Sequence, residues 1–174
     1  TGINLGTWGM DRNETFSSLV RDIVELPGDF RVRLSSINPM EIDSDLIRLM
    51  AETEKLCSHL HIPLQSGDDE TLKTMHRNYN RSQYLEVVQR AITTIPGLGL
   101  GADVIVGFPG ETDQDFDLLL DFLQPYGPAV GRRLGRLAFD QFGQRPKTRN
   151  ASDRDATLRR KINFVSGLHA VGSQ

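Results

Sequence analysis

The fold is decided by residues 57–79, CSHLHIPLQSGDDETLKTMHRNY, where a short strand gives way to a polar turn and then to a helix. Polar and apolar side chains alternate over residues 59–64, as on a strand with one buried face. Pro63 removes a backbone donor from this strand, which indicates an edge or irregular position. The turn 65–69 follows at once, where backbone N–H groups and a helix N-terminus can converge on a ligand. The helix after it is expected to carry Lys73, His76 and Arg77.

Strands and helices alternate along the rest of the chain, which favours a parallel sheet. The most strand-like run is 101–108, because Val104, Ile105 and Val106 are β-branched in succession, as in a strand buried on both faces. The other expected strands are residues 1–6, 30–36, 59–64 and 137–142. The expected helices are residues 13–26, capped by Asn13; one after Asp43 or Ser44; residues 70–75, 81–95 and 113–123, the last capped by Thr112; and one from Ser152 or Asp153 that carries Leu158, Ile162 and Val165.

No glycine motif for dinucleotide or phosphate binding accompanies these elements. An α/β fold of the open or partial (β/α) barrel type therefore fits the pattern best. Because the chain starts within a strand and its turn, we expect it to be truncated upstream.

Composition limits the class of protein. The 174 residues are 38% hydrophobic and 25% charged, which is typical of one globular domain or a piece of one. The single cysteine excludes an internal disulfide framework, and no apolar run reaches the ~18 residues of a membrane span. We therefore expect a cytoplasmic protein without membrane association.

Charge is distributed unevenly along the chain. Residues 1–130 hold 10 Lys and Arg against 20 Asp and Glu, whereas residues 131–174 hold 10 against 3. A basic tail on an acidic body can contact nucleic acid. It can equally be a solvated end, and the sequence leaves both interpretations open.

Several segments carry a family resemblance. HLHIPLQSG (59–67), LKTMHRNYNR (72–81) and GADVIVGFPGETDQDF (101–116) resemble the core of the radical S-adenosylmethionine methylthiotransferases. TGINLGTWG (1–9) and RVRLSSINP (31–39) continue the match in the same order. The similarity is greatest to the branch that adds a methylthio group to a modified adenosine in tRNA. It covers residues 1–125 and fades after Gln124.

The resemblance implies that residues 1–125 supply the later strands of a partial barrel, and that residues 126–174 form a divergent basic segment. It implies S-adenosylmethionine as cofactor, [4Fe–4S] clusters in the full-length protein, and tRNA as its partner. The residues assigned to S-adenosylmethionine are Asn4, Ser35, Gln65, Ser66, Arg77, Asp103, Gly107 and Glu111. Among them, Asn4 is expected at the methionine amino group. Arg77 is expected at the carboxylate, which a guanidinium matches bidentately.

The cluster itself is not expected in this chain. The family holds it on three cysteines, because iron is bound best by thiolates, and Cys57 stands alone outside that motif. We therefore expect the chain to be inactive by itself, with no catalytic residue of its own. His59 and His61 face one side of a strand but lack a third ligand, so a metal site is not expected.

Two alternatives remain open. The first is a barrel-type lyase or hydrolase that uses His61, Asp103 and Glu111 as acid–base groups. The second is a binding module that kept the fold and lost the cluster. In either case, unpaired strand edges would favour self-association of the isolated chain.

Overall fold

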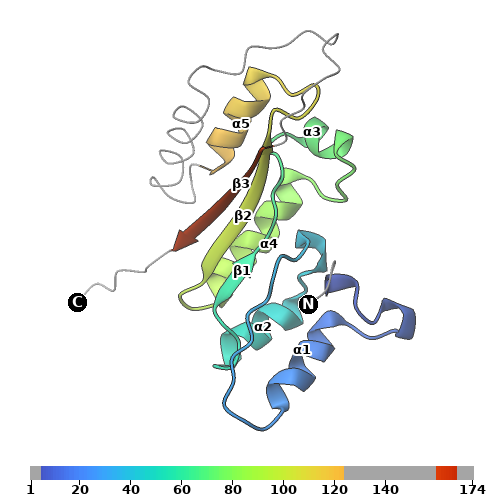
Figure 1. Ribbon diagram of the computed structural model, residues 1–174, viewed down its shortest axis with the longest axis vertical. Helices are drawn as coiled ribbons and strands as arrows, with labels where there is room; N and C mark the ends of the chain where they lie inside the picture. The colour runs from blue at the N-terminus through green and yellow to red at the C-terminus, as the bar shows by residue number, and fades with distance from the viewer. Residues whose placement is uncertain (1–4, 124–159, 168–174) are drawn as a thin grey trace, which may run out of the picture. The chain divides into compact units, whose positions relative to one another are not determined.

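A computed structural model describes residues 5–123 and the backbone of residues 160–167 (Figure 1). The described residues fall into two compact units, one within Thr1–Pro63, Ser82–Ala102 and Gly167–Gln174, the other within Leu64–Arg81 and Asp103–Ser166. We refer to them as unit 1 and unit 2. The helices are α1 (Phe16–Glu25), α2 (Ser44–Glu52), α3 (Asp69–Thr74), α4 (Arg81–Thr94) and α5 (Asp113–Leu123), with single 3-10 turns η1 (Leu5–Thr7), η2 (Met10–Arg12) and η3 (Pro39–Glu41). The strands are β1 (His59–His61), β2 (Gly99–Val106) and β3 (Arg160–Gly167).

The described strands form one sheet in the order β1-β2-β3. β1 pairs with β2 in parallel, with Leu60 opposite Leu100. Most of β2 is buried, in keeping with the β-branched run that predicted a central strand. This part of the chain is therefore α/β with a small sheet that includes a parallel pair, as expected.

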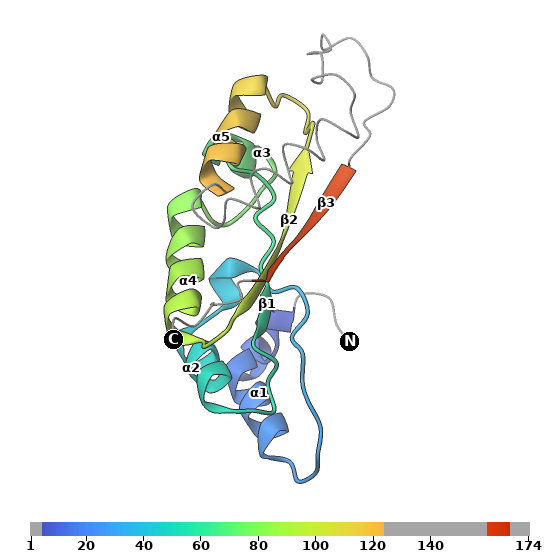
Figure 2. The same ribbon diagram turned by 90° about the vertical axis from the view of Figure 1, so that its left-hand side faces the viewer.

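In unit 1, α4 covers one face of β1, as both views show (Figures 1 and 2). Leu60 and Ile62 are completely buried, whereas His59 and His61, which alternate with them, are half-buried. The hydroxyl of Tyr84 on α4 donates to the carbonyl of Ile62 at 2.9 Å. The alternation predicted for this strand thus separates a helix-covered face from a more open one.

β1 is shorter than the predicted strand 59–64, because the regular ladder stops before Pro63. Backbone pairing nevertheless continues on either side of the proline: Ile62 N–H donates to Gly101 at 2.8 Å and Leu64 N–H to Asp103 at 3.1 Å. The irregular strand that the proline indicated is confirmed.

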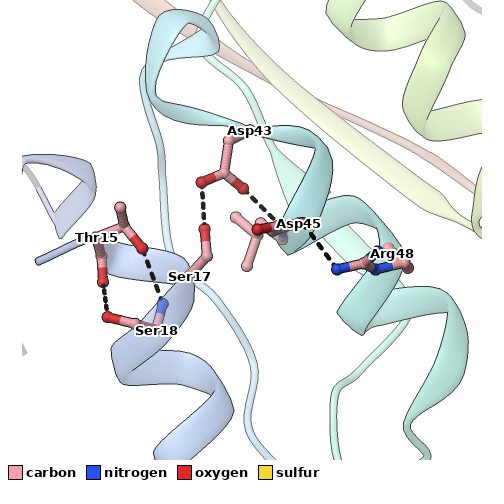
Figure 3. Close-up of polar contacts among 7 residues, drawn as sticks. Thr15, Ser17, Ser18, Asp43, Asp45 and Arg48 are labelled. Atoms are coloured by element: carbon pink, nitrogen blue, oxygen red, sulfur yellow. Dashed lines mark hydrogen bonds and ion pairs between the residues drawn. The ribbon is translucent and has the colours of Figure 1, made fainter.

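Helices α1 and α2 lie side by side in unit 1 (Figure 1). Their N-termini are tied together through Asp43, the N-cap of α2 (Figure 3). One carboxylate oxygen of Asp43 accepts from Leu46 N–H at 2.7 Å, and the other accepts from the hydroxyl of the buried Ser17 at 2.5 Å. One side chain therefore satisfies an orphan helix donor and joins two helices.

We expect Asp43→Ala to lower the free energy of unfolding by about 2 kcal/mol, since a cap contributes about 1 and the bond from Ser17 adds to it. Urea denaturation of the chain measures this. Asp45→Ala is the matched control, because Asp45 forms only an exposed ion pair with Arg48 at 2.8 Å and should contribute about 0.5 kcal/mol or less. Equal losses in the two variants would refute the role assigned to Asp43.

Three further sequence predictions are confirmed. Asp43 caps α2, and α4 spans Arg81–Thr94 against the predicted 81–95. The predicted bounds of α5 are those observed. At its start, Thr112 N–H donates to Asp115 at 2.7 Å, while Asp115 N–H donates back to the Thr112 hydroxyl at 3.3 Å. This reciprocal pair is a capping box.

Other predictions are wrong. Residues 30–36 form isolated bridges at Val32 and Ser36 instead of a continuous strand. The cap of α1 is Thr15, whose hydroxyl accepts from Ser18 N–H at 3.1 Å, whereas Asn13 lies in the left-handed region with φ of 57°. A hydroxyl one residue before Phe16 can reach the first-turn donors, but Asn13 lies too far upstream.

The helix expected to carry Ile162 and Val165 is replaced by β3. Polar and apolar residues alternate over residues 161–164, KINF, and this period-2 pattern outweighs the helical spacing on which the prediction relied. The predicted strand 137–142, the start of that helix and Asn4 lie outside the described residues.

Candidate functional site

The candidate site lies in unit 2, where the turn after residue 64 meets the carboxyl-terminal half of β2. Gln65 N–H donates to Asp103 at 2.8 Å, and Ile105 N–H donates to Gln65 at 2.8 Å. These bonds pair the turn at Gln65 with β2 beside Asp103, so the two predicted site residues lie next to each other. Both side chains are buried, as is the adjacent Ser66, with 7%, 2% and 0% of their surface exposed respectively. Polar side chains are seldom buried unless they have a structural or functional role, so these three residues are candidates for ligand binding.

The turn has a defined backbone geometry. Gln65 adopts a left-handed conformation with φ of 68°, which costs free energy for a residue other than glycine. Ser66 N–H donates to Leu64 at 2.9 Å, and the Ser66 hydroxyl accepts from Asp68 N–H at 3.2 Å. Asp68 in turn caps α3 by accepting from Thr71 N–H at 2.7 Å. The turn is therefore rigidly connected to the helix that follows.

Gly67 brings the turn against α5. A methyl group on Gly67 would lie 2.8 Å from both the backbone nitrogen and the Cβ of Leu119, and closer still to its Cα. Leu119 is completely buried. Only glycine allows this approach, so the residue has a packing reason within the turn.

After β2, the chain makes a second turn over residues 107–111, around the carboxylate of Glu111. Glu111 Oε2 accepts from Gly107 N–H and from Phe108 N–H, the latter at 3.1 Å. Gly107 and Gly110 have φ of 77° and 92°, and no described atom lies within 4 Å of where a side chain would start on either. The carboxylate of Glu111 therefore holds this turn together, and space remains beside its two glycines.

The second oxygen of this carboxylate, Glu111 Oε1, is buried and has no hydrogen-bond partner among the described residues. Burial raises the pKa of Glu111, the two backbone N–H groups oppose this rise, and the charges of Asp115 and Asp68 add to it. Asp68 and Glu111 both belong to unit 2, so the charge of the first turn acts on the carboxylate of the second. An acceptor without a donor at this position fits a ligand that carries hydroxyl or amide groups.

Arg77 is not on a helix, contrary to the prediction that the helix after the turn carries it. α3 ends at Thr74, and His76 follows in the left-handed region with φ of 57°. His76 N–H donates to Lys73 and Arg77 N–H to Leu72, both at 2.9 Å, which is the pattern of a Schellman motif. Arg77 is exposed and forms no ion pair within the described residues. Its guanidinium is free to meet an anion.

The remaining predicted residues lie outside unit 2 or outside the described residues. Ser35 is exposed in unit 1, and Asn4 lies outside the described residues. His59, also in unit 1, accepts through Nε2 from the Arg33 guanidinium at 3.0 Å, and burial, followed by the charges of Arg33 and His61, lowers its pKa. Nothing in the described chain gathers three metal-ligating side chains.

Two residues of the site were missed at the sequence level. Asp68 caps α3, and its charge acts on Glu111 in the other turn. The signal for this cap in the sequence was its position directly after Gly67 and before a helical pattern. Tyr79 is buried, and its hydroxyl donates to the Leu64 carbonyl at 3.2 Å. No local pattern signals this contact, because it joins residues fifteen positions apart.

The two cofactors that the resemblance implies fit differently. A [4Fe–4S] cluster does not fit, because the whole sequence has one cysteine, Cys57, and cluster iron is held by several thiolates. S-adenosylmethionine does fit the two turns, since Glu111 Oε1 lacks a donor and the glycines at 107 and 110 leave room beside the backbone.

Comparison with known proteins shows the family of the chain. Residues 10–123 match the radical SAM superfamily. The chain is 38% identical over 148 residues to a threonylcarbamoyladenosine tRNA methylthiotransferase of Thermotoga maritima, which covers 85% of the chain and 33% of the relative. It is 40% identical over 125 residues to a tRNA-2-methylthio-N(6)-dimethylallyladenosine synthase of Carboxydothermus hydrogenoformans, covering 71% and 28% respectively. A synthase of the same name from Saccharopolyspora erythraea is 34% identical over 181 residues, covering 98% and 37%. The chain thus spans about a third of the length of these relatives.

Proposed function

Because the chain belongs to the radical SAM superfamily, we propose that it is the S-adenosylmethionine-binding part of a longer tRNA methylthiotransferase. The full-length enzyme would insert a methylthio group into a modified adenosine of tRNA. One structural observation carries the proposal: in unit 2, the turn of Gln65 and Ser66 pairs with β2 at Asp103, and the Glu111 turn follows directly after β2. The names of the relatives, all of them tRNA-modifying enzymes, support the reaction type.

The residues of unit 2 would act by binding and orientation. Asp103 and Glu111 would accept hydrogen bonds from the adenosine part of the cofactor, and the glycines at 107 and 110 would let it approach the backbone. Gln65 and Ser66 would line the opposite turn. Arg77, exposed and without an anionic partner in the described chain, would bind the methionine carboxylate. Ser35 and Asn4 are kept as proposed cofactor residues on the family resemblance alone.

The cluster would have to come from outside this chain, because Cys57 cannot hold it alone. When bound to such a cluster, S-adenosylmethionine supplies the radical chemistry of the superfamily. We accordingly propose that residues 1–125 are the later part of a partial barrel and that residues 126–174 form a divergent basic segment. A cytoplasmic location, tRNA as partner, and self-association of the isolated chain through open barrel edges follow from the same proposal. Among the described residues, no helix has the length and apolar character that crossing a membrane requires.

Anaerobic reconstitution with iron and sulfide tests the proposal. We expect the 174-residue chain to retain no cluster absorption after desalting, because it offers one thiol. The full-length protein should retain clusters, bind S-adenosylmethionine, and produce a methylthioadenosine nucleoside in tRNA that mass spectrometry detects. A cluster-loaded 174-residue chain would refute the ligand argument, and a full-length protein that binds no S-adenosylmethionine would refute the function.

The alternative of a lyase or hydrolase that uses His61, Asp103 and Glu111 is less well supported. One carboxylate oxygen of Glu111 already accepts hydrogen bonds within its own turn, which leaves it less suited to acid–base catalysis. The similar proteins are named as tRNA-modifying enzymes, not as lyases or hydrolases. A binding module without a cluster is distinguished from the enzyme by the same reconstitution of the full-length protein.

A further inference from the structure

Two buried tyrosines donate to the two carbonyls on either side of Pro63. Tyr79 donates to Leu64 at 3.2 Å within unit 2, and Tyr84 donates to Ile62 at 2.9 Å within unit 1. Both rings are almost fully buried, with 6% and 4% of their surface exposed. The two contacts are chemically alike, but only the Leu64 carbonyl belongs to the turn of the candidate site.

The Leu64 carbonyl, at the start of that turn, accepts two hydrogen bonds. It accepts from the Tyr79 hydroxyl and also from Ser66 N–H at 2.9 Å. Gln65 between them is held in the left-handed region, a conformation that persists only where the surroundings impose it. Pro63 offers no N–H to the sheet, so this end of the segment has one backbone donor fewer than a regular strand. The Tyr79 hydroxyl adds a hydrogen bond where the regular ladder is interrupted.

Tyr79 also belongs to the segment that carries Arg77. The charge of Arg77 lowers the pKa of Tyr79, against a larger rise caused by burial, so the guanidinium lies near the phenol. The ring therefore fastens the segment after α3 to the turn of Gln65 and Ser66. Both ends of this link carry residues that we assigned to S-adenosylmethionine.

We propose that Tyr79 is a positioning residue, whose hydroxyl bond to Leu64 sets the Gln65–Ser66 turn and the Arg77 segment relative to one another for S-adenosylmethionine binding. This inference rests on the proposed function for the identity of the ligand. The positioning of the turn by Tyr79 does not depend on it, and the two can be tested separately.

The experiment compares Tyr79→Phe with Tyr84→Phe in the full-length, cluster-containing protein. Each variant loses one buried hydroxyl and one bond to a carbonyl beside Pro63, so similar losses of thermal stability are expected. In Tyr79→Phe, amide exchange at Gln65 and Ile105 should accelerate about ten-fold, because both amides belong to bonds of the turn. The Kd for S-adenosylmethionine, from calorimetric titration, should rise about five-fold, the effect of one net hydrogen bond. Tyr84→Phe should change both quantities by about two-fold or less.

Equal changes in the two variants would show that Tyr79 is merely part of the core and would overturn the proposal, as would unchanged exchange at Gln65 in Tyr79→Phe. Faster exchange with an unchanged Kd would overturn the part that concerns the ligand. A wild-type protein that binds no S-adenosylmethionine would refute the proposed function, whereas the exchange data would still decide the positioning.

If Tyr79→Phe does not fold, 3-fluorotyrosine at position 79 keeps the hydroxyl as a stronger donor. Slower exchange at Gln65 would then support the proposal, and unchanged exchange would overturn it.

Discussion

Gly67→Ala is expected to lower the free energy of unfolding by about 3 kcal/mol, at the upper end of the cost of overpacking a core. The added methyl group would overlap the backbone of Leu119 and not the end of a flexible side chain. Because Leu119 is fully buried on α5, neither partner can turn away. Relief would require the helix or the turn to shift, and a shifted turn should also weaken any ligand bound beside Gln65. Urea denaturation of the chain measures the first effect.

Gly99→Ala is the matched control. Gly99 starts β2 in unit 1, its φ lies outside the left-handed region, and a methyl group there would meet its nearest neighbour, His59 Cδ2, at an ordinary 3.5 Å. Alanine should be tolerated at this position with a change of about 1 kcal/mol or less, since glycine has a higher entropy cost in a strand. If Gly67→Ala were equally harmless, the close approach of the turn to α5 would not exist in the folded protein.

The elements that sequence predicted well are those with strong local signals. β2 was found from three β-branched residues in succession, and α5 from the pairing of Thr112 with Asp115. The end of α3 was missed because His76 adopts a left-handed conformation that usually calls for glycine. Residues 30–36 alternate like a strand, but alternation does not reveal whether a partner pairs with each residue. In the structure only Val32 and Ser36 are paired as bridges.

For the site, the sequence predicted which residue types lie at strand exits better than it predicted which hydrogen bonds each side-chain atom makes. Gln65 and Asp103 do lie next to each other, because Gln65 forms a parallel bridge to β2. By contrast, the Ser66 hydroxyl accepts from Asp68, and one oxygen of Glu111 holds its own turn. Such local bonds compete with ligand contacts, and they depend on backbone angles that composition and periodicity do not specify. Tyr79 shows the converse, since a contact across fifteen residues gives an ordinary core aromatic a specific partner.

The stability of the protein at alkaline pH should depend on Tyr79. Burial raises its pKa to about 12, whereas an exposed tyrosine ionises at 10.0. Between these values the unfolded chain releases the phenol proton while the native protein keeps it, so ionisation favours unfolding. The contribution is fully present below pH 10 and is lost as pH rises toward 12. The loss amounts to about 2–3 kcal/mol, from ~1.4 kcal/mol per unit of pKa difference.

Tyr79→Phe isolates this effect from the other groups that titrate at high pH. Below pH 10 the variant should be less stable than the wild type, because it lacks the bond to Leu64. Above pH 10 the wild type should lose stability faster, so the difference between the two free energies of unfolding should move by about 2–3 kcal/mol in favour of the variant by pH 12. Urea denaturation at intervals across this range measures it. Parallel curves would mean that the Tyr79 phenol ionises as readily in the native protein as in the unfolded chain. The hydroxyl would then be in contact with water, and neither its bond to the Leu64 carbonyl nor its role in setting the turn could stand.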